Sequence, residues 1–90
     1  MSQTAYEGCL QTHYGMVLKR LREVGGISQE ELAFRTGLDR TYVSMLERSL
    51  RQPSLATVEK ISVAFGMKPS SFVEMVEHAC DFEATVFKAK

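Results

Sequence analysis

Residues 29–48, QEELAFRTGLDRTYVSMLER, have the pattern of two short helices joined by a tight turn. The small Ala33 fits the place where the second helix would cross close to the first. Gly37 follows where the first helix must end, because glycine adopts a positive φ at no steric cost. Val43 and Leu46 form the apolar stripe of the second helix. This stretch therefore predicts a pair of crossed helices around which the rest of the chain packs.

The second of these helices has an outer face of long, polar or adaptable side chains with no core to enter. These side chains belong to Arg40, Thr41, Ser44, Met45 and Arg48. An arginine in the first turn can pair with guanine through two hydrogen bonds, hydroxyls can bond to bases, and a methionine can pack against a thymine methyl. The pattern predicts DNA base contacts in the major groove by Arg40, Thr41, Ser44 and Met45. The alternatives are a phosphate contact by Arg40 and a merely surface-exposed Met45.

The similarity to a known family extends beyond this stretch. Between about residues 14 and 76 the segments LKRLRE, ISQEELA, LDRTYVS, LER, RQPSL and AFGMKPSSF follow one another in register. Together they resemble the phage-repressor (Cro-like, XRE-type) helix-turn-helix family. The segment LDRTYVS is also similar to the small controller proteins of restriction–modification systems. The resemblance implies an all-α, five-helix lambda-repressor-like DNA-binding domain, with the helix-turn-helix at helices 2 and 3.

The resemblance also implies contacts with the DNA backbone. The residues at the matching positions are Gln29, Tyr42, Arg48, Ser49, Arg51 and Gln52. Gln29 would lie at a helix start, where backbone N–H groups and the positive helix end favour a phosphate. The ring of Tyr42 has a second candidate role at the edge of the core. The loop at residues 49–52 has a simpler alternative, which is a solvated connection.

Arg22 and Glu47 are assigned to structure before DNA binding. In the phage-repressor family that this chain resembles, these positions form an ion pair that links the first helix to the third. Glu47 falls beside Val43 and Leu46 on the inner flank of its helix, and a carboxylate placed there needs a cationic partner. We therefore predict a buried or half-buried Arg22–Glu47 pair, with any phosphate contact by Arg22 secondary.

The charges are unevenly distributed although the net charge is zero. Residues 19–51 contain seven basic and five acidic side chains, and all six arginines of the chain lie there. Arginine is suited to phosphate and guanine contacts. A locally basic face on a neutral body predicts modest non-specific affinity for DNA, with specificity supplied by dimeric binding. Double-stranded DNA and a second copy of the chain are thus the expected partners.

The flanking sequence predicts three further helices. Residues 12–24 carry one apolar face, a later helix would follow the capping residue Ser54, and the last would begin at Pro69, which suits a first helical position. The chain then divides into an N-terminal arm at residues 1–11, a helix-turn-helix domain at residues 12–80 and a C-terminal extension at residues 81–90. The extension fits either a helix or a strand, and both alternatives stay open.

The last predicted helix and the extension carry more apolar surface than one small domain has room to bury. The candidate dimer contacts are Phe72, Val76, Ala79, Phe82 and Phe87. One monomer makes few contacts with DNA, and a second copy adds its own through effective concentration. The sequence therefore predicts a homodimer on a palindromic operator, with recognition helices in successive major grooves about 34 Å apart.

Cys9 and Cys80 lie near opposite ends of the chain without a CxxC partner. We expect two free thiols, as in a reducing compartment, rather than a disulfide. A zinc site combining them with His13 and His78 would require both chain ends to meet, so no metal site is expected. The sequence has no phosphate-cradling glycine loop and no nucleophile–base spacing above chance. Neither a cofactor nor catalytic residues are expected.

Ninety residues are enough for one small domain. No apolar run approaches the ~20 residues that span a bilayer. No basic-then-apolar leader opens the chain, so we expect a cytoplasmic protein with no membrane partner.

The predicted function is sequence-specific regulation of transcription by promoter occlusion or by recruitment of RNA polymerase, in the manner of a controller protein. One alternative is an antitoxin that binds a toxin as well as its own promoter, and another is a detached DNA-binding module of a larger regulator. Phe34 falls opposite Leu32 on its helix. It is either a solitary exposed aromatic residue or part of a protein-contact patch.

Overall fold

Five α-helices make up the part of the chain that the computed structural model describes, namely the backbone of residues 8–88 and the side chains of residues 8–81. They are α1 (Cys9–Val24), α2 (Gln29–Thr36), α3 (Arg40–Glu47), α4 (Leu55–Ala64) and α5 (Pro69–Lys88). No strand occurs within residues 8–88, and the prediction of an all-α, five-helix fold is confirmed. None of the helices searched is long and apolar enough to cross a membrane.

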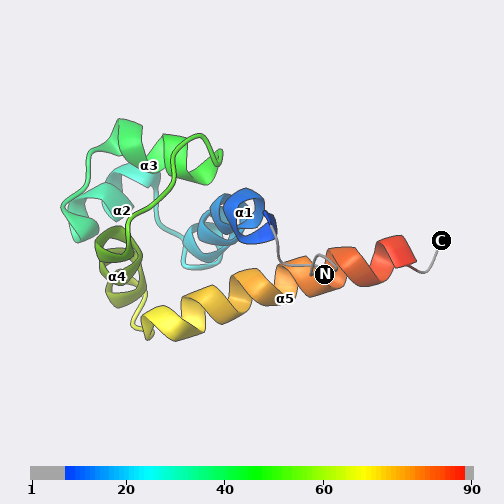
Figure 1. Cartoon of the computed structure of the whole chain (residues 1–90). Helices are drawn as coiled ribbons and strands as arrows, with labels where there is room; N and C mark the ends of the chain where they lie inside the picture. The colour runs from blue at the N-terminus through cyan, green and yellow to red at the C-terminus, as the bar shows by residue number, and fades with distance from the viewer. Residues whose placement is uncertain (1–7, 89–90) are drawn as a thin grey trace.

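The first four helices form a cluster, and α5 runs along one side of it (Figure 1). α2 packs against α3 and α4, while α1 packs against α3 and α5. α3 and α5 consequently lie on opposite sides of the molecule (Figure 1). The C-terminal end of α5 continues beyond the cluster (Figure 1). This arrangement leaves the outer face of α3 clear of the other helices.

Side-chain caps determine where the two central helices begin. The Ser28 hydroxyl accepts a hydrogen bond from the Glu31 N–H at 3.0 Å, which starts α2. Asp39 starts α3 in the same way, because its carboxylate accepts from the Thr41 N–H at 3.1 Å. Each cap of this kind contributes about 1 kcal/mol to stability. Gly37 ends α2 with a φ of 74°, which turns the chain sharply toward α3.

The core lies where the five helices meet. Its buried apolar residues are Tyr14, Val17, Leu18, Leu32, Ala33, Val43, Leu46, Ile61, Phe72 and Val76. Gly15 of α1 faces α3 at very short range, since a Cβ added to it would stand 2.5 Å from the Leu46 carbonyl oxygen. A side chain does not fit in that space. Glycine is therefore what allows α1 to approach the backbone of α3 so closely.

Both outer helices extend further than the sequence predicts. α1 begins at Cys9 rather than near residue 12. α5 continues to Lys88, so the backbone of residues 81–88 adopts the helical alternative. Outside the described residues lie positions 1–7 of the expected arm and 89–90 of the expected extension.

The expectation of two free thiols is wrong. Cys9, at the first position of α1, is disulfide-bonded to Cys80 of α5, and their Cα atoms are 6.0 Å apart. The contact follows from the packing of α1 against α5, which brings together residues that are 71 positions apart in sequence. Spacing along the chain contains no signal for such a pair.

Candidate nucleic-acid interface

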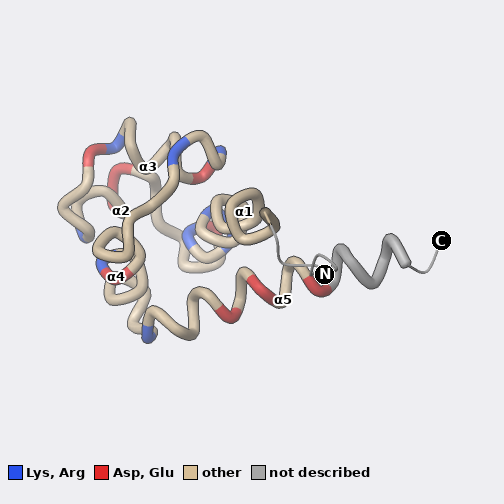
Figure 2. Tube along the Cα trace, in the orientation of Figure 1, with Lys and Arg blue, Asp and Glu red and all other residues tan. Residues whose placement is uncertain are grey.

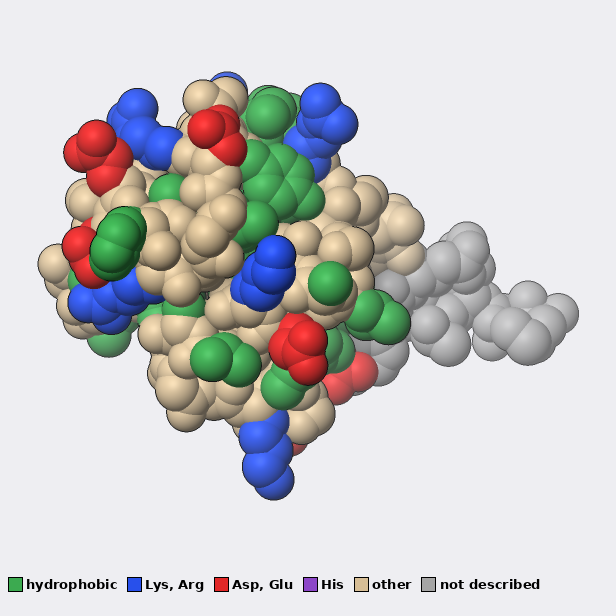
Figure 3. Space-filling model, turned by 90° about the vertical axis from the view of Figure 1, so that its left-hand side faces the viewer, with side chains coloured by type: hydrophobic (Ala, Val, Ile, Leu, Met, Phe, Trp, Pro, Cys, Tyr) green, Lys and Arg blue, Asp and Glu red, His purple; other side chains and the backbone are tan. Residues whose placement is uncertain are grey.

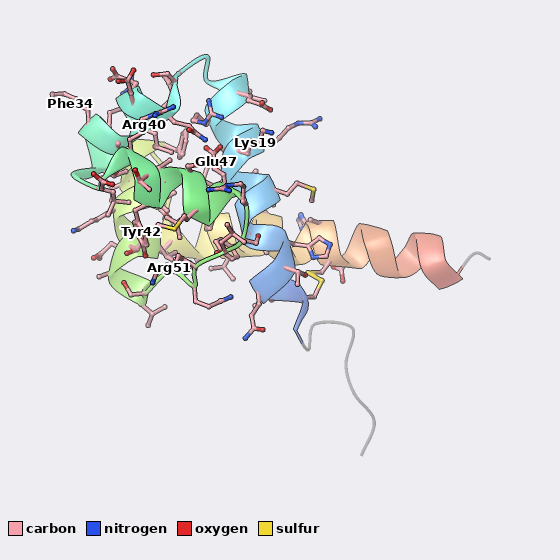
Figure 4. All side chains as sticks on the ribbon, turned by 90° about the horizontal axis from the view of Figure 1, so that it is seen from above. Lys19, Phe34, Arg40, Tyr42, Glu47 and Arg51 are labelled. Carbon is pink, nitrogen blue, oxygen red and sulfur yellow. A yellow bond between two sulfur atoms is a disulfide. The ribbon has the colours of Figure 1, made fainter. Side chains whose placement is uncertain are left out.

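The outward face of α3 carries the four residues predicted to contact bases. Figure 4 looks down on this face and shows Arg40 at one end of the helix. Arg40 and Thr41 in the first turn are exposed, and Ser44 and Met45 are half-buried farther along. The opposite side of α3 is buried in the core. The first turn is therefore the most accessible part of this helix.

A network of hydrogen bonds holds the other end of α3. The Arg22 guanidinium donates to Glu47 from Nε at 2.5 Å and from Nη2 at 3.1 Å. Gln29, the first residue of α2, donates from Nε2 to Glu47 Oε1 at 3.0 Å. The Glu47 side chain is only 2% exposed and that of Arg22 is 13% exposed. Arg22 and Glu47 thus form an ion pair, as expected for these two positions, and α3 is joined to both α1 and α2.

Arg22 remains positively charged in this network. Hydrogen bonds to Glu47 hold the pKa of Arg22 above its usual value, although burial acts in the opposite direction. Arg22 also donates from Nη1 to the Ile27 carbonyl oxygen at 3.0 Å, which satisfies a further N–H group. Two parallel charge-assisted hydrogen bonds are stronger and more directional than neutral ones. The orientation of α3 relative to α1 is therefore fixed by charge as well as by packing.

Gln29 makes a contact that the sequence did not predict. Its position at the start of α2 suggested a phosphate contact, but its side-chain amide is directed to Glu47. An ionised carboxylate has about four acceptor sites, and the two bonds from Arg22 leave room for another donor. Gln29 supplies that donor. A phosphate contact by this side chain would compete with the bond to Glu47.

The loop after α3 contains one residue in a rare backbone conformation. Ser49 has a φ of 58°, in the left-handed region that non-glycine residues seldom adopt. Its hydroxyl donates to the Thr12 carbonyl oxygen at 3.3 Å, so the loop is tied to the first turns of α1. Arg48 at the end of α3 and the loop residues Arg51 and Gln52 are exposed. The loop can therefore present two guanidinium groups and an amide beside the recognition helix.

Two tyrosines lie close to this loop. Tyr42 of α3 is half-buried and packs against the core, which agrees with the second of its two candidate roles. Tyr14 of α1 is buried, and burial raises the pKa of its hydroxyl; Tyr42 acts in the same direction and the backbone of Arg51 against it. Tyr14 therefore remains neutral at physiological pH. Its buried side chain therefore supports the loop by packing and not by charge.

Basic and acidic residues are placed differently on the two sides of the molecule. Figure 2 shows Lys and Arg on α1 and around α3, interspersed with acidic residues, whereas the described part of α5 carries mainly acidic ones. Figure 3 shows basic side chains standing out at the upper end of the molecule, where α3 lies. Lys19 of α1 also projects outward in the view onto α3 (Figure 4). A polyanion is therefore drawn to the α3 side rather than to the α5 side.

The residues predicted to form a dimer interface fall into three groups. Phe72 and Val76 are each 2% exposed and belong to the core of the single chain, so, contrary to the prediction, they offer almost no surface to a second copy. Ala79 is half-buried against the same core. The side chains of Phe82 and Phe87 lie outside the described residues.

An apolar groove between α1 and α5 was not expected from the sequence. It is lined by Met16, Val17, Arg20, Met75 and Ala79. Met16 is 55% exposed and Met75 is 37% exposed, on two helices that pack against each other. Met75 lies at the flank of the apolar face of α5, one turn before Ala79, and Met16 lies on the outer side of α1. The sequence alone does not tell that these two helices are neighbours.

Three of the four residues considered for a zinc site lie together. The potential ligand atoms of Cys9, His13 and Cys80 are all within 4.8 Å of one another, and His78 is outside this group. The two sulfur atoms are bonded to each other, whereas a metal would need both as thiolates. The arrangement is therefore a disulfide with an adjacent imidazole.

Residues 18–72 match the protein family described as Helix-turn-helix. The chain is 40% identical over 62 residues to Control protein C.BamHI of Bacillus amyloliquefaciens, a match that covers 68% of this chain and 76% of that protein. The fold is similar to the restriction–modification controller protein C.AhdI from Aeromonas hydrophila, at 40% identity and a TM-score of 0.66, covering 69% of this chain and 94% of that one. It is also similar to the restriction–modification controller protein C.Esp1396I, solved as a tetramer with its natural 35-base-pair operator, at 32% identity and a TM-score of 0.72. This match covers 79% of this chain and 93% of that one.

Proposed function

The chain belongs to the helix-turn-helix family and is related to restriction–modification controller proteins, and from this premise we propose how it binds its operator. As a member of this family it is a DNA-binding regulator of transcription. Two copies bind one palindromic operator, and each places α3 in the major groove. The two grooves are successive, so the α3 helices lie about 34 Å apart.

The observation that carries the proposal is the fixed outward presentation of α3. Its inner face is buried, its far end is bound by Arg22 and Gln29 through Glu47, and Gly15 brings α1 against its backbone. A helix held in this way keeps its exposed side chains in one position before DNA arrives. Preorganisation of this kind lowers the entropic cost of binding.

Arg40 is the principal base-reading residue in this proposal. It is exposed in the first turn of α3, the part of a recognition helix that contacts base edges. Its guanidinium can donate two hydrogen bonds to O6 and N7 of guanine. Thr41 and Ser44 supply hydroxyls along the same helix, and Met45 supplies an apolar contact for a thymine methyl. These four side chains set the sequence preference of each half-site.

The segment after α3 contacts the DNA backbone and fixes the register of the complex. Arg48 and Arg51 provide charge, and Ser49 and Gln52 provide hydrogen-bonding groups. The hydrogen bond from Ser49 to α1 limits the movement of this loop. Such contacts contribute affinity without sequence information and weaken as salt concentration rises.

The second copy binds on the α1–α5 side. Met16 and Met75 expose apolar surface there, and Ala79 lines the same groove. Phe82 and Phe87 remain proposed contacts farther along α5. This side is removed from α3, so two copies can associate without covering the surface that reads DNA (Figure 1).

Regulation follows from occupancy of the operator. A bound dimer either excludes RNA polymerase from an overlapping promoter or contacts the polymerase beside it. Both outcomes require the protein to be present where the DNA is, and we assign it to the cytoplasm. The distance between operator and promoter decides which outcome applies.

The antitoxin alternative has no support. The relatives described above are named control and controller proteins, not antitoxins. The surfaces considered for a toxin partner were Phe34 and the apolar C-terminal residues, whose side chains beyond residue 81 lie outside the described ones. Phe34 is 83% exposed at the edge of the molecule (Figure 4). Isolated exposed apolar residues are common on protein surfaces.

The proposal is tested by selecting bound sequences from a random pool of duplex DNA. We expect a palindromic consensus, with a guanine in each half-site that depends on Arg40. Arg40→Ala should weaken operator binding by about 1–3 kcal/mol per half-site and relax the preference at that base pair. Titration of labelled operator by each protein at fixed salt gives both quantities.

Lys68→Ala is the matched control, because Lys68 is an exposed cation in the connection between α4 and α5, away from α3. It removes the same charge and should leave the consensus unchanged. If the Arg40 and Lys68 variants behave alike, charge alone accounts for binding and α3 does not read bases. A selection that returns no consensus contradicts the proposed function as a whole.

A further inference from the structure

The disulfide joins two helices that have different positions in the proposed complex. Cys9 opens α1, which packs against α3, and Cys80 belongs to α5, the helix on the opposite side of the molecule from α3 (Figure 1). The bond closes a loop that contains most of the chain, since its two residues are 71 positions apart. Its presence or absence therefore changes how firmly α1 is attached to α5.

The two cysteine residues differ in exposure. Cys80 is 1% exposed, whereas Cys9 is only partly buried. His13 lies one turn along α1 and places its ring Nδ1 at 3.3 Å from the Cys9 sulfur. The same Nδ1 also lies 3.0 Å from the Cys9 carbonyl oxygen and 2.9 Å from the Thr12 hydroxyl oxygen, so the ring is held beside the sulfur. The thiolate is the reactive form of cysteine. Cys9 is thus the more exposed of the two residues and the one that a reagent in solution meets first, and Cys80 is the internal partner.

The same turn of α1 also supports the loop that is proposed to contact the DNA backbone. The Thr12 carbonyl oxygen, three residues after Cys9, accepts the hydrogen bond from Ser49 at 3.3 Å. Gly15, in the next turn, lies directly against Leu46 and Ser49. A continuous set of contacts therefore runs from the disulfide through the first two turns of α1 to the end of α3.

We propose that Cys9 and Cys80 form a thiol–disulfide switch that responds to small-molecule disulfides and adjusts operator affinity through α1. When the bond is closed, the first turn of α1 is fixed to α5 and holds the loop around Ser49 in its DNA-binding shape. When the bond is reduced, this turn loosens and the affinity for the operator falls. The part that concerns DNA rests on the function proposed above. Disulfides in reducing compartments are usually transient, and a partly accessible sulfur favours exchange.

The chemistry is two successive exchange steps. The Cys9 thiolate attacks a disulfide RSSR, which forms a Cys9–S–SR bond and releases one RS⁻. The Cys80 thiolate then attacks the Cys9 sulfur, which forms the internal disulfide and releases a second RS⁻. Two cysteine thiols are oxidised, one RSSR is reduced to two RSH, and the two cysteine protons end on the released thiols. Reduction follows the reverse path and begins at the accessible Cys9 sulfur.

The first experiment measures the bond without DNA. The full chain is equilibrated in mixtures of reduced and oxidised glutathione, alkylated and weighed by mass spectrometry, and its thermal midpoint is recorded. As the mixture becomes more oxidising, we expect each chain to change from two alkylated cysteines to none, with its mass remaining that of a single chain. The thermal midpoint of unfolding should be about 10 °C or more lower in the reduced form. The double variant Cys9→Ser with Cys80→Ala should have a midpoint that does not depend on the mixture.

Three results would overturn the switch at this stage. The cysteines could stay alkylated in every mixture, or the bond could form between chains rather than within them. The reduced protein could instead bind one equivalent of Zn²⁺ tightly enough to prevent oxidation, which would identify the cluster of Cys9, His13 and Cys80 as a metal site.

The second experiment compares operator binding by the oxidised and reduced protein. We expect reduction to weaken binding by about fivefold or more in the wild type and to have no effect in the double variant. Equal affinity of the two wild-type forms would overturn the link to DNA while leaving the bond itself established. If neither form prefers any sequence, the function proposed above fails and the link to DNA fails with it, whereas the result of the first experiment stands independently.

Discussion

Helix α1 is attached to its neighbours at two places by different chemistry. Toward its C-terminal end Arg22 is joined to Glu47 of α3, with Gln29 as a third member; we name this set the recognition joint. At its N-terminal end Cys9 is joined to Cys80 of α5; we name this pair the sulfur joint. The recognition joint depends on charge and the sulfur joint on oxidation. One helix thus holds α3 through a contact that depends on charge and is attached to α5 through a second one that solution conditions can alter.

The largest effect is expected from breaking the recognition joint. Glu47→Ala leaves the Arg22 guanidinium buried without its counter-charge and removes a hydrogen-bond acceptor from Gln29. We expect the free energy of unfolding to fall by about 3–5 kcal/mol, measured by urea denaturation.

Glu31→Ala is the control for that variant. Glu31 pairs with Arg35 at 2.9 Å, but both side chains are nearly half exposed, at 45% and 46%. An exposed pair of this kind contributes about 0.5 kcal/mol. Similar losses in the free energy of unfolding of the two variants would show that burial does not make the ion pair of the recognition joint more stabilising than an exposed pair.

An intermediate effect is expected from Gly15→Ala, because Gly15 lies on α1 between the two joints. The added Cβ would stand 2.5 Å from the Leu46 carbonyl oxygen and 2.7 Å from that of Glu47. These are backbone atoms, so α1 and α3 must move apart. We expect a loss of about 1–3 kcal/mol in urea denaturation, accompanied by weaker operator binding.

Measuring the stability loss of the Gly15→Ala variant in both oxidised and reduced samples tests whether the two joints act independently. If the sulfur joint stabilises α1 independently of the close approach to α3, the loss should be the same in both samples. A loss that appears in one sample alone would show that the joints are coupled through α1.

The smallest effect concerns the pH dependence of stability. Burial raises the pKa of Tyr14 above its ordinary value of 10.0. The unfolded chain therefore loses this proton at lower pH than the folded chain. The stability associated with the neutral hydroxyl is fully present below pH 10 and is lost as pH rises toward the folded pKa.

Tyr14→Phe removes that contribution to the pH dependence. The variant should differ from wild type by no more than about 1 kcal/mol at neutral pH and should lose less stability above pH 10. Denaturation curves of both proteins across the alkaline range provide the measurement. Parallel decline of the two proteins would show that Tyr14 does not titrate differently on folding.

The recognition joint and the sulfur joint also differ in how far the sequence predicts them. The helix-turn-helix depends on local features, such as the capping residue Ser28 and the helix-ending Gly37. Glu47 could be assigned to an ion pair because an acidic residue on an apolar flank needs a cation, and the family resemblance supplied Arg22. The hydrogen bond from the Gln29 side chain to Glu47 was not predicted, because an amide can donate to phosphates and carboxylates alike. The choice depends on which acceptor lies closer in the folded chain.

The α5 side was harder to predict for a physical reason. The periodic spacing of Phe72 and Val76 identifies an apolar face but not whether that face meets its own chain or another one. In the structure it meets the core. The contact between Cys9 and Cys80 depends on how α1 and α5 cross, and no local pattern determines that geometry.

Ser49 limits which sequences can form this fold. It combines a left-handed backbone, with a φ of 58°, and a hydroxyl that reaches α1. Side chains branched at Cβ are disfavoured in that conformation, and glycine would suit the backbone but could not reach α1. A library with every amino acid at this position, sorted for operator binding, should retain chiefly serine and asparagine, with glycine enriched less because it lacks the contact to α1. The adjacent Leu50, which is 60% exposed, should accept a much broader range.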